Sequence, residues 1–327
     1  MELLDIALSS IEFLTFREKN LLRETLSCAD ELCSLGKEDI ASIIKRQIRS
    51  EGWDGKRCLA LAERAFAVLE RFGIKAFSSR DKGYPVLFQE IFDPPYMVFA
   101  RGDIGCLGKK CVSVVGTRRI CPECAENTIE FASDCASDGL TVASGLAYGV
   151  DTFAHKGVLS VKGGSTAAVL PCGIDTVMPR GNVSLAARIL ESGGVLLSEY
   201  LPGVPSESWR YVKRNRLIAA LSPVTVVMQA PPGSGALITV DFALGYNRIP
   251  AFHKGCFCDA AEKLVNQAKA SLIAKNTGAA LRKLEFSCES YVKEGAPVFG
   301  NYEEFSRILN EADFGSQIHP RDLELEF

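Results

Sequence analysis

Between residues 109 and 252, short apolar runs alternate with longer segments of helical periodicity, and small or polar residues follow the runs. The runs, such as 111–115 and 166–170, are almost continuously apolar instead of alternating with polar residues. Runs of this kind are typical of parallel strands that helices cover on both faces. The pattern predicts an α/β fold with an extended Rossmann-like, mainly parallel sheet and helices on both of its faces.

A small helical domain is predicted to precede this core, over residues 1–78. Apolar residues at positions 61, 65, 68, 69 and 72 have the spacing of one helical face, and Gly73 follows as a stop signal. Shorter helices are expected at about 5–14 and 38–49.

The Rossmann-like core is predicted over residues 79–255, with strands at 76–77 and 97–100 leading into it. Residues 256–327 are expected to form a C-terminal extension, mostly helical or irregular. Its periodicity predicts one helix, at about 260–273. No paired strands follow that helix, so a winged helix is not expected there.

The balance of charge restricts how this chain could contact a nucleic acid. With 37 Lys and Arg residues against 40 Asp and Glu residues, its formal net charge is −3, so any DNA contact has to be a local patch. Residues 210–216 form such a patch, since they hold four cations and no acid. The C-terminal residues 311–326 are mainly acidic, and are predicted to be solvated or to bind a basic protein surface.

Two segments bear on localisation. The N-terminus carries acids at positions 2 and 5, where a secretion signal needs bases. Residues 217–240 are uncharged and long enough to suggest a membrane span, but prolines and glycines interrupt them. They are better interpreted as a helix end, a strand, a loop and a helix start. We therefore expect a cytoplasmic protein without a membrane partner.

Signature residues lie where the predicted strands end, which is the edge at which ligands bind in open α/β sheets. Small residues there allow close backbone approach, helix N-termini favour anions, and arginine supplies charge. The sequence therefore predicts a phosphate-binding site that contacts nucleic acid through Gly116, Thr117, Arg118, Ser144, Gly145, Lys213, Arg214, Asn215, Arg216, Ser234 and Gly235.

The side chains of the basic residues in 213–216 are expected to point to different sides of their helix. On a helix, Lys213 and Arg216 share a face, while Arg214 points elsewhere. Neither Arg118 nor Arg216 is expected to lie in the core. Each is therefore predicted to be free to meet a phosphate.

Four neighbouring residues have a structural interpretation beside the functional one. Trp209 and Tyr211 could stack on unpaired bases or simply pack, and both interpretations stay open. Asp151 carries the wrong charge for a phosphate contact and is expected to cap or orient a loop. His155 is expected to pack or to form a hydrogen bond, not to act in catalysis.

A series of short motifs covers roughly residues 84–252, over half of the chain. The motifs are Tyr84-Pro85, Asp93-Pro94-Pro95 with Arg101-Gly102, Gly116-Thr117-Arg118, the segment 144–151, Ala154-His155, Pro179 with Asn182 and Leu185, the segments 197–200 and 214–222, Ser234-Gly235 and Arg248. In this order they resemble the DprA (Smf, DNA-processing) family, a bacterial group that binds single-stranded DNA and hands it to the recombinase RecA. The resemblance implies single-stranded DNA and RecA as partners, a homodimer, and protection of DNA during transformation and recombination.

An enzyme on the same fold is the main alternative. Residues 232–236 resemble the phosphate loop of LOG-type nucleotide phosphoribohydrolases, which cleave a base from a nucleoside monophosphate. That family has a catalytic Glu where this chain has Thr239, and Thr supplies no carboxylate for an oxocarbenium-like transition state. Asp241 lies two residues on, about 200° further round a helix, and faces away.

Other chemistries lack their motifs. The sequence contains no G-x-x-x-x-G-K-[ST] loop, no G-x-S-x-G elbow and, after Gly116, no dinucleotide-binding glycine spacing. We therefore expect a phosphate-binding protein without catalysis and without a cofactor. A pure scaffold with a vestigial site is the third alternative.

The cysteines raise the question of a metal. Cys121-Pro122-Glu123-Cys124 has the spacing of half a zinc site, but Cys256-Phe257-Cys258 does not. The chain has 12 cysteines, most of them among apolar residues. They are therefore interpreted as small core residues, and no metal is expected.

Overall fold

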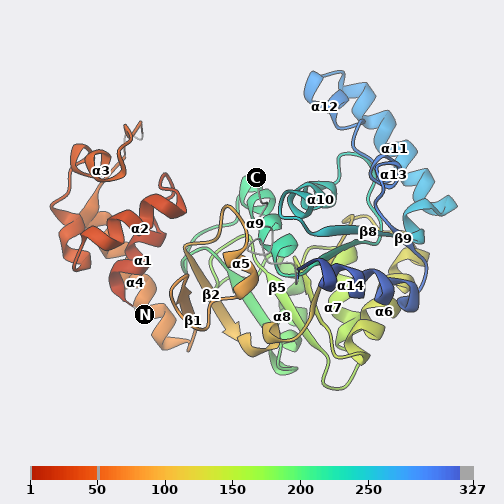
Figure 1. Ribbon diagram of the computed structural model, residues 1–327, viewed down its shortest axis with the longest axis horizontal. Coiled ribbons are helices and arrows are strands. Elements are labelled where there is room, and N and C mark those ends of the chain that lie inside the picture. Colours follow the sequence, from red (N-terminus) through yellow and green to blue (C-terminus); the bar gives the residue numbers. More distant parts are fainter. Residues whose placement is uncertain (1, 50–51, 317–327) are drawn as a thin grey trace, which may run out of the picture.

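The computed structural model describes residues 2–49 and 52–316, and its centre is a nine-stranded sheet (Figure 1). The strand order is β1-β2-β6-β5-β4-β3-β7-β8-β9. Strands β3 to β9 pair in parallel, whereas β1 pairs antiparallel with β2 and β2 with β6, so the predicted mainly parallel sheet is confirmed. The strands are β1 (Lys75–Ser78), β2 (Met97–Gly102), β3 (Cys111–Val115), β4 (Thr141–Ser144), β5 (Ser165–Val169), β6 (Val195–Ser198), β7 (Val224–Val227), β8 (Ile249–His253) and β9 (Val298–Phe299).

Helices cover both faces of the sheet, which explains the apolar runs. Val112 and Val114 of β3 pack on one face, while Val115 packs on the other. The first face carries α6 (Pro122–Ser137), α7 (Val150–Val158), α8 (Val183–Glu191) and α14 (Tyr302–Ser316). The second carries α5 (Val86–Gln89), α9 (Ser208–Ala220), α10 (Gly235–Gly245) and α13 (Cys288–Lys293).

The N-terminal residues form the predicted helical region beside β1 and β2 (Figure 1). Its helices are α1 (Leu3–Ser9), α2 (Phe16–Thr25), η1 (Ala29–Cys33), α3 (Lys37–Ile44) and α4 (Gly55–Arg71). Their apolar faces share one cluster with Met97 and Phe99 of β2, so the region packs on the core. The helical part ends before β1, because residues 75–78 already pair with the sheet.

The C-terminal residues return to the core, which the sequence did not indicate. After η4 (Lys254–Phe257), α11 (Asp259–Lys275) and α12 (Gly278–Arg282) project from the body, and β9 then pairs with β8 (Figure 1). Phe305 of α14 is fully buried against Phe131 and Phe299. Within the described residues this strand extends the core sheet and does not form a wing. Most of the predicted acidic segment, after residue 316, lies outside the described residues.

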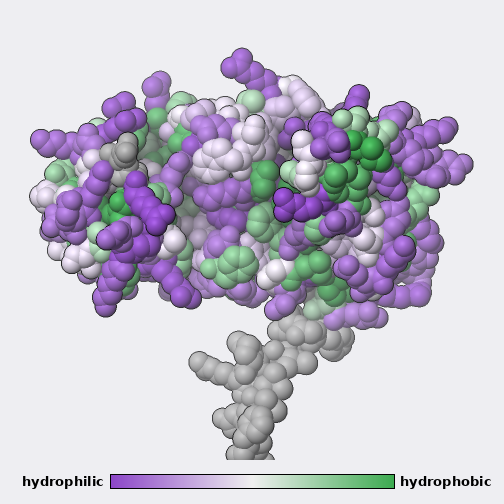
Figure 2. Space-filling view, turned by 90° about the horizontal axis from the view of Figure 1, so that it is seen from above, coloured by the Kyte–Doolittle hydropathy of each residue, from purple (hydrophilic) through white to green (hydrophobic). Residues whose placement is uncertain are grey.

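The surface is mainly hydrophilic in the view from above, with an apolar area on its right-hand side (Figure 2). Residues 217–240 form the end of α9, β7, a loop and the start of α10, as predicted. Among residues 2–49 and 52–316, no helix combines the length and the apolar composition that a membrane span requires.

Candidate nucleic-acid interface

A cleft opens where the strand order changes direction, between β3 and β7. Strands β4, β5 and β6 follow β3 on one side, and strands β8 and β9 follow β7 on the other. The loops that follow β3 and β7 therefore separate and leave a crevice, which is the usual ligand site of open α/β sheets. The cleft has a volume of about 630 Å³ and is lined by these two loops, the start of α10 and one side of α9.

Seven of the predicted site residues line this cleft, from three separate segments. They are Gly116, Thr117, Arg118, Arg214, Asn215, Ser234 and Gly235. The rule that strand ends converge therefore placed the loops correctly.

Hydrogen bonds hold the two loops in place across the cleft. The Thr117 backbone N–H donates to the Gln229 carbonyl oxygen at 2.7 Å, and the Cys121 N–H donates to the Gln229 side-chain oxygen at 3.0 Å. On α9, the Asn215 side-chain amide donates to the Gly235 carbonyl oxygen at 3.1 Å. Gln229 belongs to no motif, is buried after β7, and was not among the predicted site residues.

An exposed arginine and an aromatic ring stand together at the cleft. The Arg118 guanidinium lies 5.2 Å from the centre of the Tyr211 ring, and both residues line the cleft. Arg119 is also exposed and lines the same cleft, although it was not among the predicted site residues. Trp209, in contrast, lies outside the lining and is contacted by Arg210 and Lys213. Tyr211 is therefore the aromatic residue placed to meet a ligand here.

Arg214 lies under the floor of the cleft and is almost fully buried, with 3% of its surface exposed. Its guanidinium donates to the carbonyl oxygens of Gly145, at 2.6 Å, and Val169, at the ends of β4 and β5. A Cβ atom at position 145 would lie 2.6 Å from the guanidinium, so a larger residue there would displace Arg214. Arg214 therefore brings a positive charge to the strand ends, but its hydrogen bonds are made to the protein.

Asp151 performs the orienting role predicted for it. Its carboxylate accepts hydrogen bonds from the backbone N–H groups of Gly145, at 3.1 Å, and Ala147, at 3.2 Å. Burial raises the pKa of Asp151, and the charge of Arg214 opposes that rise. His155 is also structural, since it is fully buried and bonds to Thr166 Oγ1 at 2.7 Å.

Four predicted site residues, Ser144, Gly145, Lys213 and Arg216, do not line the cleft. The expectation that Arg216 lies outside the core is wrong. Arg216 is 4% exposed and forms ion pairs with Glu199 and Asp93. Lys213 shares that helical face, as predicted, and lies 3.8 Å from Glu199, beside a separate cavity of about 680 Å³. Ser144 is fully buried and donates to the Val114 carbonyl oxygen.

The chemistry available in the cleft is electrostatic. Its charged lining residues are three arginines, Arg118, Arg119 and Arg214, and the buried Asp151. Thr239 lines the cleft, whereas Asp241 does not and accepts a hydrogen bond from Tyr291. The cleft thus has cations for a phosphate, and its one carboxylate is occupied by backbone N–H groups.

Incubation with nucleoside monophosphates is expected to release no free base, because Thr239 stands where a carboxylate would be needed. Chromatographic detection of free base over a long incubation checks this expectation. Turnover that is present in the wild-type protein and lost in Asp241→Asn would contradict it.

The chain is similar to several known proteins. A sequence profile of the family described as DNA recombination-mediator protein A matches residues 75–305. Protein Smf of Borreliella burgdorferi is 35% identical over 207 residues, which cover 63% of this chain and 66% of that protein. The DNA processing protein DprA of Bacillus subtilis is 33% identical over 186 residues, covering 57% of this chain and 62% of that protein. In both, the matched part is less than two thirds of the relative's own length.

Among solved structures, DNA processing protein A from Streptococcus pneumoniae is similar with a TM-score of 0.67 and 25% identity. That match covers 93% of this chain and 96% of the other. DNA processing protein A from Helicobacter pylori, whose structure concerns its single-stranded DNA binding mode, has a TM-score of 0.52 and 28% identity. That match covers 60% of this chain and 88% of the Helicobacter pylori chain.

Proposed function

Because this chain belongs to the DNA recombination-mediator protein A family, we propose that it binds single-stranded DNA in the arginine-lined cleft between β3 and β7. The observation that carries the proposal is the grouping of Arg118, Arg119 and Arg214 at the strand ends without a free carboxylate. Phosphates of a nucleic-acid backbone are met by arginine side chains, backbone N–H groups and helix N-termini.

A single strand suits this cleft better than a duplex. Unpaired bases can stack on aromatic rings while the backbone follows cations, and this combination is typical of single-strand binders. Arg118 and Tyr211 supply one cation and one ring within 5.2 Å of each other. The DNA processing protein A structure from Helicobacter pylori concerns the same ligand in that protein. We therefore assign phosphate contact to Arg118 and base stacking to Tyr211.

The family also suggests the cellular role. We propose that the protein protects single-stranded DNA in the cytoplasm and transfers it to a RecA recombinase, without catalysing a reaction itself. A homodimer belongs to the same proposal. Its support is the chain's place in the family, together with the lack of a free carboxylate in the cleft described above.

Binding of a labelled oligonucleotide over a series of salt concentrations tests the proposal. The logarithm of the association constant should fall linearly with the logarithm of salt, by about 0.7 for each phosphate neutralised. Single strands of different sequence should bind alike, and a duplex of the same length should bind more weakly. Absence of salt-sensitive binding would instead support the scaffold interpretation.

A further inference from the structure

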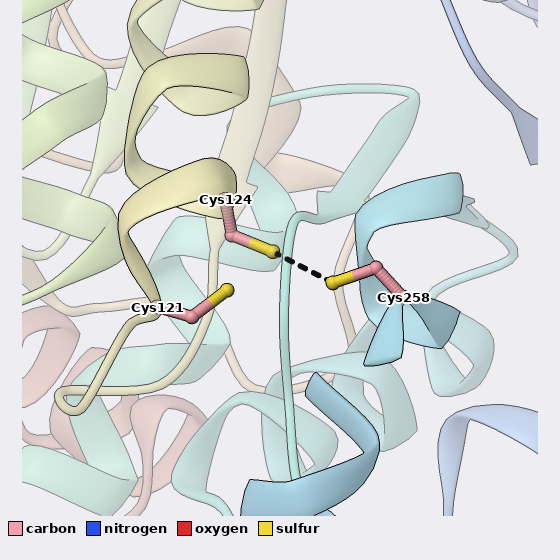
Figure 3. A group of neighbouring side chains, drawn as sticks. All are labelled: Cys121, Cys124 and Cys258. Carbon is pink, nitrogen blue, oxygen red and sulfur yellow. Dashed lines mark hydrogen bonds between the residues drawn. The ribbon is translucent and has the colours of Figure 1, made fainter. Parts of the chain in front are cut away.

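Three cysteine sulfurs from two segments far apart in the sequence lie close together, and none of these cysteines lines the cleft (Figure 3). Cys121 and Cys124 come from the start of α6, and Cys258 comes from the start of α11. The three sulfur atoms lie within 4.8 Å of one another, and those of Cys124 and Cys258 are 4.0 Å apart. No metal was expected from the sequence, because Cys256-Phe257-Cys258 lacks the spacing of a second half-site and most cysteines lie among apolar residues. In the structure a single further cysteine, Cys258, lies beside the first pair.

The separations suit one ion shared by three sulfurs. A zinc–sulfur bond of about 2.3 Å in tetrahedral geometry places neighbouring sulfurs about 3.8 Å apart. The distance of 4.0 Å between Cys124 and Cys258 is close to this value. The third sulfur has to move by no more than about 1 Å to complete the geometry.

Two of the three cysteines lie at helix N-termini. Cys121 is the N-cap of α6 and Cys258 is the N-cap of α11, helices of 16 and 17 residues. In neither helix does the N-cap side chain form a capping hydrogen bond with the first turn. Helix N-termini lower the energy of a thiolate, and a thiolate is the form that binds a metal.

A glycine between the two segments permits their approach. A Cβ atom at Gly255 would lie 3.1 Å from the Cys124 sulfur, and the Cys124 thiol donates to the Gly255 carbonyl oxygen at 3.1 Å. Cys124 is fully buried and Cys121 nearly so, whereas Cys258 is only partly buried. The open side of the cluster is therefore the side of Cys258, where water can supply a fourth ligand.

Nearby cysteines do not belong to the cluster. The Cys256 thiol donates to the Val227 carbonyl oxygen at 3.3 Å, and the Cys288 thiol donates to the Ala230 carbonyl oxygen at 3.1 Å. Cys256 thus points into the core although it is two residues from Cys258. Of the two residues in the C-x-C segment, only Cys258 therefore belongs to the cluster.

We propose that Cys121, Cys124 and Cys258 bind one Zn²⁺ ion as thiolates, with water at the fourth position. Three sulfur ligands favour a soft or borderline cation over Mg²⁺ or Ca²⁺. Binding releases the protons of the thiols and joins the loop after β3 to the start of α11. The ion would thus link two segments that are far apart in the sequence, since Cys124 and Cys258 are 134 residues apart.

Metal analysis of the full chain, purified under reducing conditions and reconstituted with zinc, tests the site. The wild-type protein should hold about one zinc per chain after desalting, and Cys124→Ser or Cys258→Ser should hold more than about tenfold less. Cys258 is partly exposed, so its variant should fold even if the Cys124 variant does not. Substitution of the wild-type protein with Co²⁺ should add a thiolate-to-metal charge-transfer band.

Two controls separate the cluster from general damage to the core. Cys135→Ser changes a buried thiol on the same helix α6, and Cys256→Ser changes the neighbour of Cys258. Both should keep their zinc. A chelator should lower the melting temperature of the wild-type protein but not that of Cys258→Ser. Three results would overturn the proposal: a reduced wild-type protein that retains no zinc, zinc that persists in Cys258→Ser, or iron in place of zinc.

Discussion

Replacing Arg118 with Glu should weaken single-stranded DNA binding by about tenfold to a hundredfold while the protein stays folded. Arg118 is exposed in the cleft lining, and its guanidinium lies over the Tyr211 ring. The substitution removes a cation that meets phosphate and puts a repelling charge in its place. Arg118→Ala should have a smaller effect, equal for all sequences, and lower the salt slope by about one contact.

A charge-matched control distinguishes a contact from a general change in net charge. Arg188→Glu makes the same change on an exposed part of α8, outside the cleft lining, and should leave affinity nearly unchanged. Tyr211→Ala should weaken binding without changing the salt slope, because stacking involves no phosphate. If a folded Arg118→Glu protein bound oligonucleotide as well as the wild type, the DNA site would have to lie elsewhere.

The fold was largely predictable because parallel strands buried on both faces have a distinctive composition. Buried runs such as 111–115 and 224–227 identified strands, and the rule on strand ends then grouped the loops that follow them. Short or atypical elements were missed. Helix α2 has a capping box at Thr15 and Glu18 that could have revealed it. Strand β9 has two residues, too few for any periodicity.

The direction of each arginine was harder to predict than the site itself. Helical spacing correctly placed Lys213 and Arg216 on one face and Arg214 on another. Helical spacing does not show which acid each arginine pairs with. Glu199 follows β6, and Asp93 belongs to the connection between β1 and β2, so the acids that hold Arg216 come from elsewhere in the chain. The three cations of residues 213–216 therefore have different surroundings: Arg216 is in a buried ion pair, Arg214 lies buried under the cleft floor, and Lys213 is exposed.

This burial changes what charge reversal at Arg216 would do. A Glu at that position would lie beside Glu199 and Asp93, three acids in a largely buried space. A double reversal of Arg118 and Arg216 would then lose DNA binding through damage to the fold. Arg118 is the residue to test for binding, and Arg216 is the residue to test for stability.

Replacing Arg216 with Met should lower the free energy of unfolding by about 3 kcal/mol or more, because it removes one partner of a buried ion pair. The side chains of Arg216 and Glu199 are only 5% and 8% exposed. Burial alone would lower the pKa of Arg216, but Glu199 and Asp93 outweigh it and raise that pKa. The charged pair is thus favoured in the folded protein, and Met would leave the Glu199 carboxylate without its buried partner, although Lys213 would stay 3.8 Å away.

Lys213→Met is the matched control, since Lys213 lies on the same helix as Arg216 and contacts the same carboxylate, that of Glu199. The Lys213 side chain is 43% exposed, and exposed ion pairs contribute no more than about 1 kcal/mol. Urea unfolding of the two variants compares them directly, through the midpoint at an unchanged slope. Adding Glu199→Gln to Arg216→Met should recover part of the loss, because the unpaired charge is then gone. Equal midpoints for Arg216→Met and Lys213→Met would show that the buried pair has no special weight in the fold.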